Sequence, residues 1–461
     1  MRVVIVGAGQ VGFAIAERLT FEKHEVVLVD RDAGRLGDVA GRLDVAAVEG
    51  TGCSPVVLRR TGIETAGLVI AVTDSDEVNL LACLIAGRLA PGAMRVARVR
   101  DPEYHADPEV FRGEPFGLAS AINPEEEAAR RIARAVSAPG ALDVIPLLGG
   151  RVLVLGLRIE AGSPPAGRTL TEIRPLATVQ MRVACIEHRG TLTIPRGPDR
   201  MEAGDIAYVA CRSEDAAAVL RFAGKSGQPV RRVMIFGAED LATYLAMALS
   251  AARISVKILS SDAERCRVCA ERVPQALVVQ GDGTDPEVLR EEGIDAIDAF
   301  VACSRHEERN IPAALLAKSL GARLAMVAAA SATYEHLAPS IGIDAATSPQ
   351  SAVVGSILQL VRRGRILGVH ALWSRDAEVI ELQALEASKL VAVPLKDTGF
   401  PQGAMVLAVA RGDAVLVPHG DTVIVPGDRV VTIVERRIIH KVEKLFTGRS
   451  DSLPPARPNG S

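Results

Sequence analysis

The sequence predicts an α/β fold in which two doubly wound parallel-sheet domains alternate with two small α+β domains. Residues 1–32 read MRVVIVGAGQVGFAIAERLTFEKHEVVLVDRD, the order of a β-strand, a glycine turn, a helix and a second strand in a Rossmann-like unit. A worn copy, RRVMIFGAEDLATYLAMALSAARISVKILSSD, occupies residues 231–262. Each copy continues as alternating strands and helices, which favours a parallel sheet, and is followed by a region of short strands.

This pattern divides the chain into four domains and a tail. We expect a nucleotide-binding Rossmann-like domain, a small domain, a Rossmann-like domain with a degenerate site and a second small domain, at residues 1–140, 141–227, 231–350 and 366–448. Residues 449–461, rich in Pro and Ser, are expected to be a disordered tail. In each small domain the sequence predicts a hairpin closed by a Gly-Asp turn, at Gly204-Asp205 and at Gly427-Asp428.

The first Rossmann-like copy carries a complete dinucleotide-binding fingerprint. The apolar strand Val3–Val6 leads into three spaced glycines and an alanine-rich helix. Gly7 permits the tight turn, Gly9 lets backbone N–H groups approach a pyrophosphate, and Gly12 lets the helix pack closely on the strand. Asp30 ends the second strand, where a carboxylate accepts hydrogen bonds from both ribose hydroxyls. The fingerprint therefore predicts NAD or an adenine nucleotide rather than NADP.

Further candidate residues follow from the position of ligands in such sheets, at the carboxyl ends of the strands. Thr51 and Gly52 can offer hydroxyl and backbone groups near adenine or ribose, and Thr73 can bond a phosphate or ribose oxygen. Arg31 keeps NADP as an alternative ligand, because a guanidinium beside the ribose can stack on adenine or neutralise a 2′-phosphate. The expected cofactor-binding set is Gly7, Ala8, Gly9, Gln10, Val11, Gly12, Asp30, Arg31, Thr51, Gly52, Thr73, Asp74 and Arg98.

Two arginines at the end of the fifth strand compete for the role of phosphate ligand. We expect only one of Arg98 and Arg100 to face the cleft. We assign Arg98 to the phosphate. The alternative is an ordinary surface arginine at a strand end.

The second copy departs from the fingerprint at the positions that would contact phosphate and ribose. Glu239 replaces the second glycine, so a carboxylate points toward the pyrophosphate position, and Ser260 replaces the ribose-binding acid. The residues at the fingerprint positions of the second copy are Gly237, Glu239, Ala242, Ser260, Ala328 and Ala330. We therefore expect one competent site per chain. Shared positions that look structural are Asn79 and Asn310, Tyr104 and Tyr334, and Pro124 and Pro349.

Composition excludes several other classes of protein. The formal net charge is −3 with no basic cluster, which argues against nucleic-acid binding, and no apolar stretch reaches the length of a membrane span. The opening segment lacks the pattern of a signal peptide, so we expect a cytoplasmic protein with reduced cysteines. Cys266 and Cys269 form a CxxC in a helical stretch, where ordinary helix positions are the first interpretation and redox or metal use the second. No metal site is expected.

The four-part order and its motifs resemble the tandem form of the RCK (regulator of K⁺ conductance) domain. The motifs are VGAGQVG, the acid at Asp30, EGTG, AVTDSDEVNLLACLIA, ARVRDPEY, INPEEEAARRIA and both Gly-Asp segments. The resemblance implies N-type and C-type RCK domains in alternation and a nucleotide-binding regulatory subunit, peripheral to the inner face of the plasma membrane. Its implied partner is a potassium-translocating membrane subunit of the TrkH, TrkG or KtrB type. The two tandem RCK modules of one chain would form a pseudo-dimer. Two or four chains would then form a ring.

Other functions and ligands stay open at this stage. An NAD-dependent oxidoreductase would need a general acid or base, and no tyrosine has a lysine four residues on and no histidine has a catalytic setting. His306, in the polar segment SRHEERN, is interpreted as a helix cap. We therefore expect no enzyme activity. A soluble nucleotide sensor without a membrane partner is the third class, and NAD, NADH, ATP and ADP all present the groups that these residues would bind.

Overall fold

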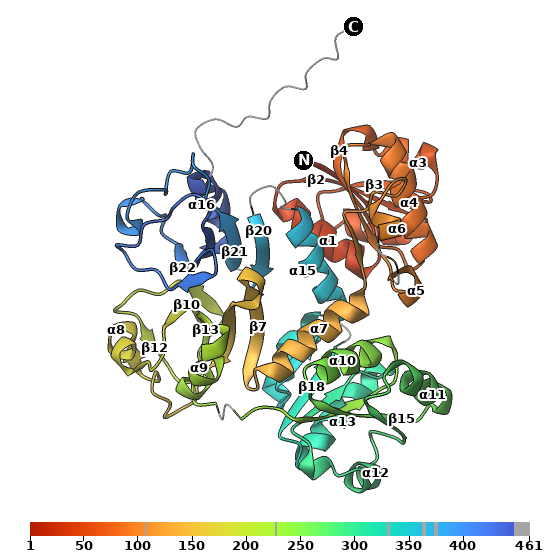
Figure 1. Cartoon of the computed structure of the whole chain (residues 1–461). Helices are drawn as coiled ribbons and strands as arrows, with labels where there is room; N and C mark the ends of the chain where they lie inside the picture. Colours follow the sequence, from red (N-terminus) through yellow and green to blue (C-terminus); the bar gives the residue numbers. More distant parts are fainter. Residues whose placement is uncertain are drawn as a thin grey trace. The chain divides into compact units, whose positions relative to one another are not determined.

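The computed structural model describes residues 1–105, 107, 109–225, 228–329, 332–361, 366–372 and 377–446 (Figure 1). The described residues group in two compact units, each assembled from two separate stretches of chain. The first unit takes residues 1–133 and 231–361, and the second takes described residues of 134–230 and 362–461. Similar domains are therefore paired with each other. The limits of four separate domains stay a prediction, and the tail expected at 449–461 lies outside the described residues.

The first unit contains two parallel six-stranded sheets with the same topology, which confirms the predicted doubly wound class. The strand orders are β3-β2-β1-β4-β5-β6 and β16-β15-β14-β17-β18-β19. In each sheet the order reverses beside the first strand, and a doubly wound sheet binds its ligand outside the carboxyl ends of the strands at that point. The strands are β1 Arg2–Val6, β2 Glu25–Asp30, β3 Ala46–Glu49, β4 Ala66–Ala71, β5 Met94–Arg98, β6 Ser120–Ile122, β14 Arg232–Phe236, β15 Ser255–Ser260, β16 Leu277–Gln280, β17 Ala299–Ala302, β18 Leu324–Ala328 and β19 Ala345–Thr347.

The helices between these strands carry one apolar face each and cover both sides of the two sheets. Most begin with a side-chain cap or with proline in the first turn, as the sequence requires for a helix after a short loop. They are α1 Gln10–Phe21, α2 Ala33–Ala40, α3 Pro55–Arg60, α4 Asp76–Leu89, α5 Pro102–His105, α6 Glu109–Arg112, α7 Pro124–Ser137, α10 Asp240–Ala251, α11 Ala263–Arg272, α12 Pro286–Glu291, α13 Glu307–Ser319, α14 Ala332–Leu337 and α15 Pro349–Val361.

Alternation along β1 assigns its side chains to two separate cores. Val3 and Ile5 pack in one cluster with α1, and Val4 and Val6 pack in the other with α4. The first cluster also contains Val353 and Ile357 of α15, both with no exposed surface. The last helix of the second Rossmann-like copy thus completes the core of the first copy, and Figure 1 shows α15 beside α1.

Buried asparagines tie the fourth and fifth strands together in both copies. Asn79 accepts hydrogen bonds from the backbone N–H and the hydroxyl of Thr73, both at 2.8 Å, and donates to the carbonyls of Thr73 and Arg98. Asn310 makes the same four bonds with Ser304 and Ala328. These amides are 0% and 1% exposed, so their shared position is structural, as predicted.

The other two pairs of shared positions differ in whether both members have the same structural environment. Pro124 and Pro349 are each the first residue of a helix, where a missing N–H costs nothing. Tyr104 packs edge-on against Phe111 at 5.8 Å between ring centroids. Its counterpart Tyr334 is 49% exposed, so this pair shares a sequence position without sharing a packing role.

The second unit contains two antiparallel five-stranded sheets, in the orders β11-β10-β13-β8-β7 and β20-β21-β24-β22-β23. One apolar core joins them, because Val154 and Tyr208 of the first sheet lie in the same cluster as Val379 and Ile433 of the second. The strands are β7 Ala141–Leu147, β8 Val152–Arg158, β9 Arg168–Thr169, β10 Met181–His188, β11 Thr191–Thr193, β12 Arg200–Met201, β13 Ile206–Arg212, β20 Ile366–Ala371, β21 Ala377–Gln383, β22 Ala404–Arg411, β23 Ala414–Leu416 and β24 Arg429–Glu435. The helices are α8 Leu170–Ile173, α9 Ala216–Phe222 and α16 Ile439–Phe446.

The predicted Gly-Asp hairpins are wrong. β11 and β13 lie on opposite sides of β10, and the tight turn that joins neighbouring strands is Arg189-Gly190, where both residues have positive φ. Gly204-Asp205 instead lies in the turn before β13, with the Asp205 carboxylate accepting the Glu202 N–H at 2.8 Å. In the second small domain, β23 pairs with β22 and not with β24. Such a segment resembles a hairpin in sequence because a turn and a strand follow each other, whereas the pairing partner lies further along the chain.

Candidate nucleotide-binding cleft

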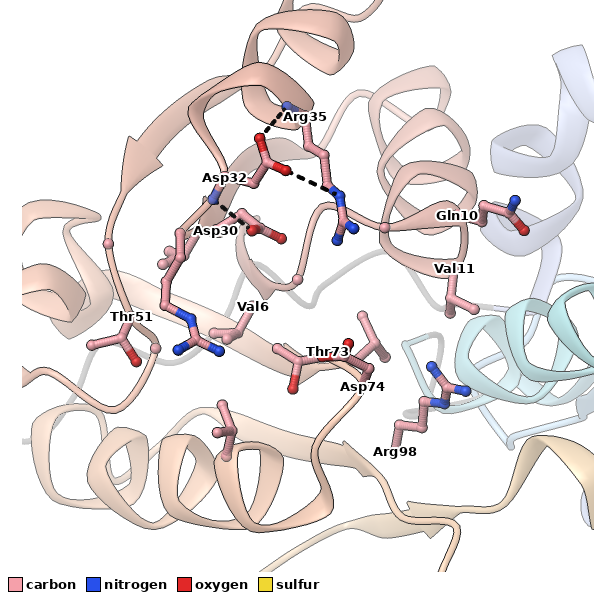
Figure 2. Close-up of a pocket in the computed structure, with 18 of the residues that line it drawn as sticks. Val6, Gln10, Val11, Asp30, Asp32, Arg35, Thr51, Thr73, Asp74 and Arg98 are labelled. Atoms are coloured by element: carbon pink, nitrogen blue, oxygen red, sulfur yellow. Dashed lines mark hydrogen bonds and ion pairs between the residues drawn. The ribbon is translucent and has the colours of Figure 1, made fainter.

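An open cleft lies at the carboxyl ends of the strands in the first Rossmann-like copy, at the topological switch point between β1 and β4 (Figure 2). Its volume is ≈ 510 Å³, within the range of about 300–1,000 Å³ that is usual for small-molecule sites. Its lining residues are Val6, Gly7, Gly9, Gln10, Val11, Val29, Asp30, Arg31, Asp32, Arg35, Gly50, Thr51, Gly52, Val72, Thr73, Asp74, Val78, Arg98 and Gln350. Of the thirteen residues predicted from the sequence, Ala8 and Gly12 are the two outside this lining.

The three glycines are needed for three different geometric reasons. Gly7 has φ +111°, and a Cβ there would lie 3.0 Å from the backbone of Val72 and Thr73. A Cβ on Gly12 would lie 1.9 Å from the Gly7 carbonyl oxygen, so only glycine lets α1 approach β1 this closely. A Cβ on Gly9 would meet no atom within 4 Å. Gly9 is therefore not required for the unliganded fold, and its bare backbone leaves the cleft open at the start of α1.

The start of α1 presents free backbone donors to this opening. Gly9 is the N-cap of the helix and no side chain caps it. The first N–H groups of a helix have no intrahelical acceptor and attract anions. The position is therefore suited to phosphate oxygens.

Asp30 performs a structural task in addition to the one predicted. One carboxylate oxygen accepts the Ala8 N–H at 2.7 Å and the other accepts the Asp32 N–H at 2.9 Å. The carboxylate thereby clamps the glycine turn to the end of β2, and Figure 2 shows it facing the cleft. Each carboxylate oxygen has a second acceptor position, so both stay able to bind a ribose hydroxyl.

The two candidate arginines separate clearly. Arg98 lines the cleft, and its buried Nε has no hydrogen-bond partner among the described residues. Burial lowers the pKa of Arg98, and the neighbouring Arg100 lowers it further. The Arg100 guanidinium instead donates to the Asp74 carbonyl, and its backbone N–H donates to Asp76 at 2.8 Å. The carboxylates of Glu125, Asp76 and Asp74 act on the pKa of Arg98 in the opposite direction. A buried Nε–H without an acceptor is costly, and an anion in the cleft would satisfy it.

The threonines of the cleft are already held by local bonds. The Thr73 hydroxyl bonds the Asn79 side chain at 2.8 Å, and the Thr51 hydroxyl accepts the Cys53 N–H at 3.3 Å. These bonds fix the orientation of both side chains at the wall of the cleft. Each hydroxyl retains further bonding capacity for a ligand.

Several lining residues were not predicted from the sequence. Asp32 caps α2 and pairs with Arg35 at 3.4 Å, a capping pattern that the segment VDRDAGR displays locally. Gln350 comes from α15 of the second copy and bonds Gln10 at 2.6 Å. No local signal identifies it, because the two glutamines are 340 positions apart in the chain.

The equivalent region of the second copy contains charged side chains that pair with one another. Glu239, in place of Gly9, accepts the Ala238 N–H at 3.1 Å and lies 3.8 Å from Arg265. Arg309 forms an ion pair with Asp282 at 2.5 Å. In the first copy, the residues at the Arg309 and Asp282 positions are Val78 and Thr51, which line the open cleft.

The remaining substitutions in the second copy remove side chains that would bind a nucleotide, and they add no charged group in their place. Ser260 keeps one of the two contacts of Asp30, since its hydroxyl accepts the Asp262 N–H at 3.3 Å, but it has no charge. Ala328 ends β18 where Arg98 ends β5. Ala330 lies outside the described residues.

Other sites considered from the sequence have ordinary structural environments. Cys266 and Cys269 are buried in α11, and burial raises the pKa of both thiols. His306 occupies the N-cap of α13 but its side chain makes no capping bond, so the capping role was wrong. Within the described ranges, no cluster of His, Cys, Asp and Glu is suited to a metal ion. No described helix has the length and apolarity of a membrane span.

Two Rossmann-like copies, two small domains and the cleft of the first copy place the described residues in the class of tandem RCK-type proteins. The TrkA-N domain model matches residues 3–124 and 233–349, and the TrkA-C domain model matches residues 154–224 and 379–447. The chain belongs to the Trk system potassium uptake protein TrkA family. It is 37% identical to TrkA of Halomonas elongata over 90% of the chain and 92% of that protein. It is also 37% identical to TrkA of Azorhizobium caulinodans, covering 91% and 92%.

Solved structures support the fold. The GsuK RCK domain aligns with a TM-score of 0.59 at 19% identity, over 96% of this chain and 94% of that one. The GsuK channel bound to NAD aligns with a TM-score of 0.60 at 18% identity, over 96% and 78%.

The geometry of the glycines predicts opposite outcomes for two alanine substitutions. Gly12→Ala forces α1 away from the Gly7 carbonyl and should lower the free energy of unfolding by about 1–3 kcal/mol, the usual cost of overpacking. Gly9→Ala should leave the stability of the unliganded protein unchanged. Chemical denaturation of both variants measures this, and equal destabilisation by the two substitutions would contradict the assigned roles.

Proposed function

We propose that this chain is a cytoplasmic nucleotide-binding regulatory subunit that gates a Trk- or Ktr-type potassium-uptake protein. The observation that carries the proposal is the cleft itself: Arg98 has no partner for its buried Nε, and the uncapped start of α1 faces the same space. Both features favour a bound anion. Membership of the TrkA family supports the link with potassium uptake.

The proposed ligand is NAD or NADH, or ATP or ADP. Asp30 would accept the ribose hydroxyls, the start of α1 at Gly9 would bind the diphosphate, and Arg98 would neutralise its charge. The adenosine end of the cleft would be lined by Thr51, Gly52 and Arg31. The floor of the cleft would be formed by Thr73 and Asp74. The GsuK channel has been solved bound to NAD and GsuK bound to ADP, which supports a nucleotide without selecting one.

We propose a single competent site per chain. In the second copy Glu239 places a carboxylate at the start of α10, and the Arg309–Asp282 ion pair stands at positions that are open in the first copy. A nucleotide there would have to displace this ion pair and bring its phosphates next to a carboxylate. Both requirements oppose binding.

Gating would then be a shift between conformations. A nucleotide can change a regulatory assembly only through different affinities for its states. We propose that the chain forms a homo-dimer or homo-tetramer, in which tandem modules build a ring, and that this ring docks at the inner face of the plasma membrane. The partner would be a potassium-translocating subunit of the TrkH, TrkG or KtrB type.

An NAD-dependent oxidoreductase is less well supported. The residues that line the cleft include no histidine, lysine, tyrosine or cysteine. A hydride transfer to a carbonyl usually needs such a group beside the nicotinamide. A nucleotide sensor without a membrane partner would share the cleft, and only a partner experiment separates it from the proposed function.

Matched substitutions should separate ribose from phosphate recognition. Asp30→Ala should weaken both adenosine and ADP by about 1–3 kcal/mol, because a charged acceptor for the ribose is lost. Arg98→Ala should weaken ADP and NADH by about 1.5–3 kcal/mol and leave adenosine unchanged. Arg100→Ala is the control, because Arg100 does not line the cleft and its guanidinium donates to the Asp74 carbonyl. Calorimetric titration measures all three, and loss of ADP binding in Arg100→Ala alone would reverse the arginine assignment.

The functional test uses a strain that lacks this chain and any homologue of it. Potassium uptake at low external potassium should be impaired and should return with the wild-type chain. The Arg98→Ala chain should still associate with membranes yet fail to restore nucleotide-dependent uptake. Normal uptake in the deletion strain would disprove the proposed function.

A further inference from the structure

We propose that the second Rossmann-like copy supplies part of the nucleotide site of the first. Gln350 of α15 and Gln10 of α1 form an amide bridge that holds the phosphate end of the ligand and links ligand binding to the contact between the two copies. This inference rests on the proposed function, because it assumes a nucleotide in the cleft. It assigns a role to a residue outside the fingerprint.

The bridge is a direct hydrogen bond at the edge of the cleft. The Gln350 side-chain amide donates to the Gln10 carbonyl oxygen at 2.6 Å, and both residues line the cleft. Gln10 is the first residue of α1 and Gln350 the second residue of α15. Two helix starts therefore meet at one point, immediately after Gly9.

The remaining bonding capacity of the bridge suits phosphate oxygens. A glutamine amide has two N–H donors, so Gln10 keeps both and Gln350 keeps one after the bridge has formed. These neutral donors extend the row of backbone donors at the start of α1. Arg98 lines the same cleft and adds the positive charge. In Figure 2, Gln10 and Arg98 lie beside a helix coloured as the second copy.

Apolar packing fixes the position of Gln350. Val353 and Ile357, both fully buried, follow on the same helix and lie in the cluster that contains Val11 and Ile15 of α1. Any movement of α15 relative to α1 would expose these side chains and break the bridge. A ligand that bonds both glutamines therefore favours the docked arrangement, by the difference in its affinity for the two arrangements.

The pseudo-symmetric positions differ in the way that this role requires. At the second cleft, Asp240 is the first residue of α10 and Glu125 the second residue of α7. Both are carboxylates. Burial and the nearby Asp240 raise the pKa of Glu125, whereas Arg98 and Arg100 lower it. Amides thus stand at these two positions beside the open cleft, and acids stand at the equivalent positions of the second copy.

The test compares ADP with adenosine, which lacks phosphate. Gln350→Ala should weaken ADP binding roughly 2- to 12-fold, the range for one net hydrogen bond, and leave adenosine binding unchanged. Gln350→Glu keeps the size of the side chain and should weaken ADP binding more strongly, because it places a negative charge beside the phosphates. The control is Ser356→Ala, which removes the 2.8 Å bond from α15 to Glu127 without touching the cleft. It should bind ADP as the wild type does.

A second readout tests the link between the copies. ADP should slow hydrogen exchange of the backbone amides of residues 353–357 in the wild type, and should not do so in Gln350→Ala. Unchanged ADP affinity in both Gln350 variants, or an equal loss of adenosine binding, would overturn the bridge. Failure of the wild type to bind any adenine nucleotide would instead disprove the nucleotide site on which the proposed function rests.

Discussion

The first cleft depends on how closely α1 approaches β1. Because Gly12 has no Cβ, the helix lies directly against the Gly7 carbonyl, and the start of the helix is aimed along the carboxyl end of the sheet. The Asp30 carboxylate then holds the turn from the other side through the Ala8 N–H. A turn clamped at both ends keeps its remaining N–H groups in one orientation without help from a ligand. Such preorganised donors are the basis of anion binding in this fold.

The second copy has the same sheet without a glycine at the position of Gly12. Ala242 replaces Gly12 and is fully buried, and Gly237 keeps a positive φ of 123°, so the strand and helix persist. Glu239 then stands at the Gly9 position and accepts the Ala238 N–H, and Arg309 pairs with Asp282 at the positions of Val78 and Thr51. The chain thus retains a complete fold in which side chains supply the charges that a ligand would otherwise supply. Its α15 meanwhile completes the core of the first copy.

Local patterns predicted the features that are themselves local. The apolar run Val3–Val6 and the spacing of Gly7, Gly9 and Gly12 indicated the strand, the turn and the helix correctly. Alternation could not separate Arg98 from Arg100, because residues two apart on a strand share a face and β5 ends at Arg98. Contacts between distant segments were not predictable in this way. Gln350 reaches the cleft only because Val353 and Ile357 are buried in another domain, and β11 pairs with β10 rather than β13 because sheet order depends on the whole domain. That these residues bind a nucleotide stays a prediction.

Calorimetric titration of the full-length chain with ADP tests the central claim most directly, because the number of sites depends on the difference between the two clefts. We predict one tight site per chain. The Gly9→Glu variant carries in the first cleft the residue type of Glu239. Loss of ADP binding in this variant would show that the tight site is the first cleft. Two equal sites per chain, or one site that survives Gly9→Glu, would contradict the account.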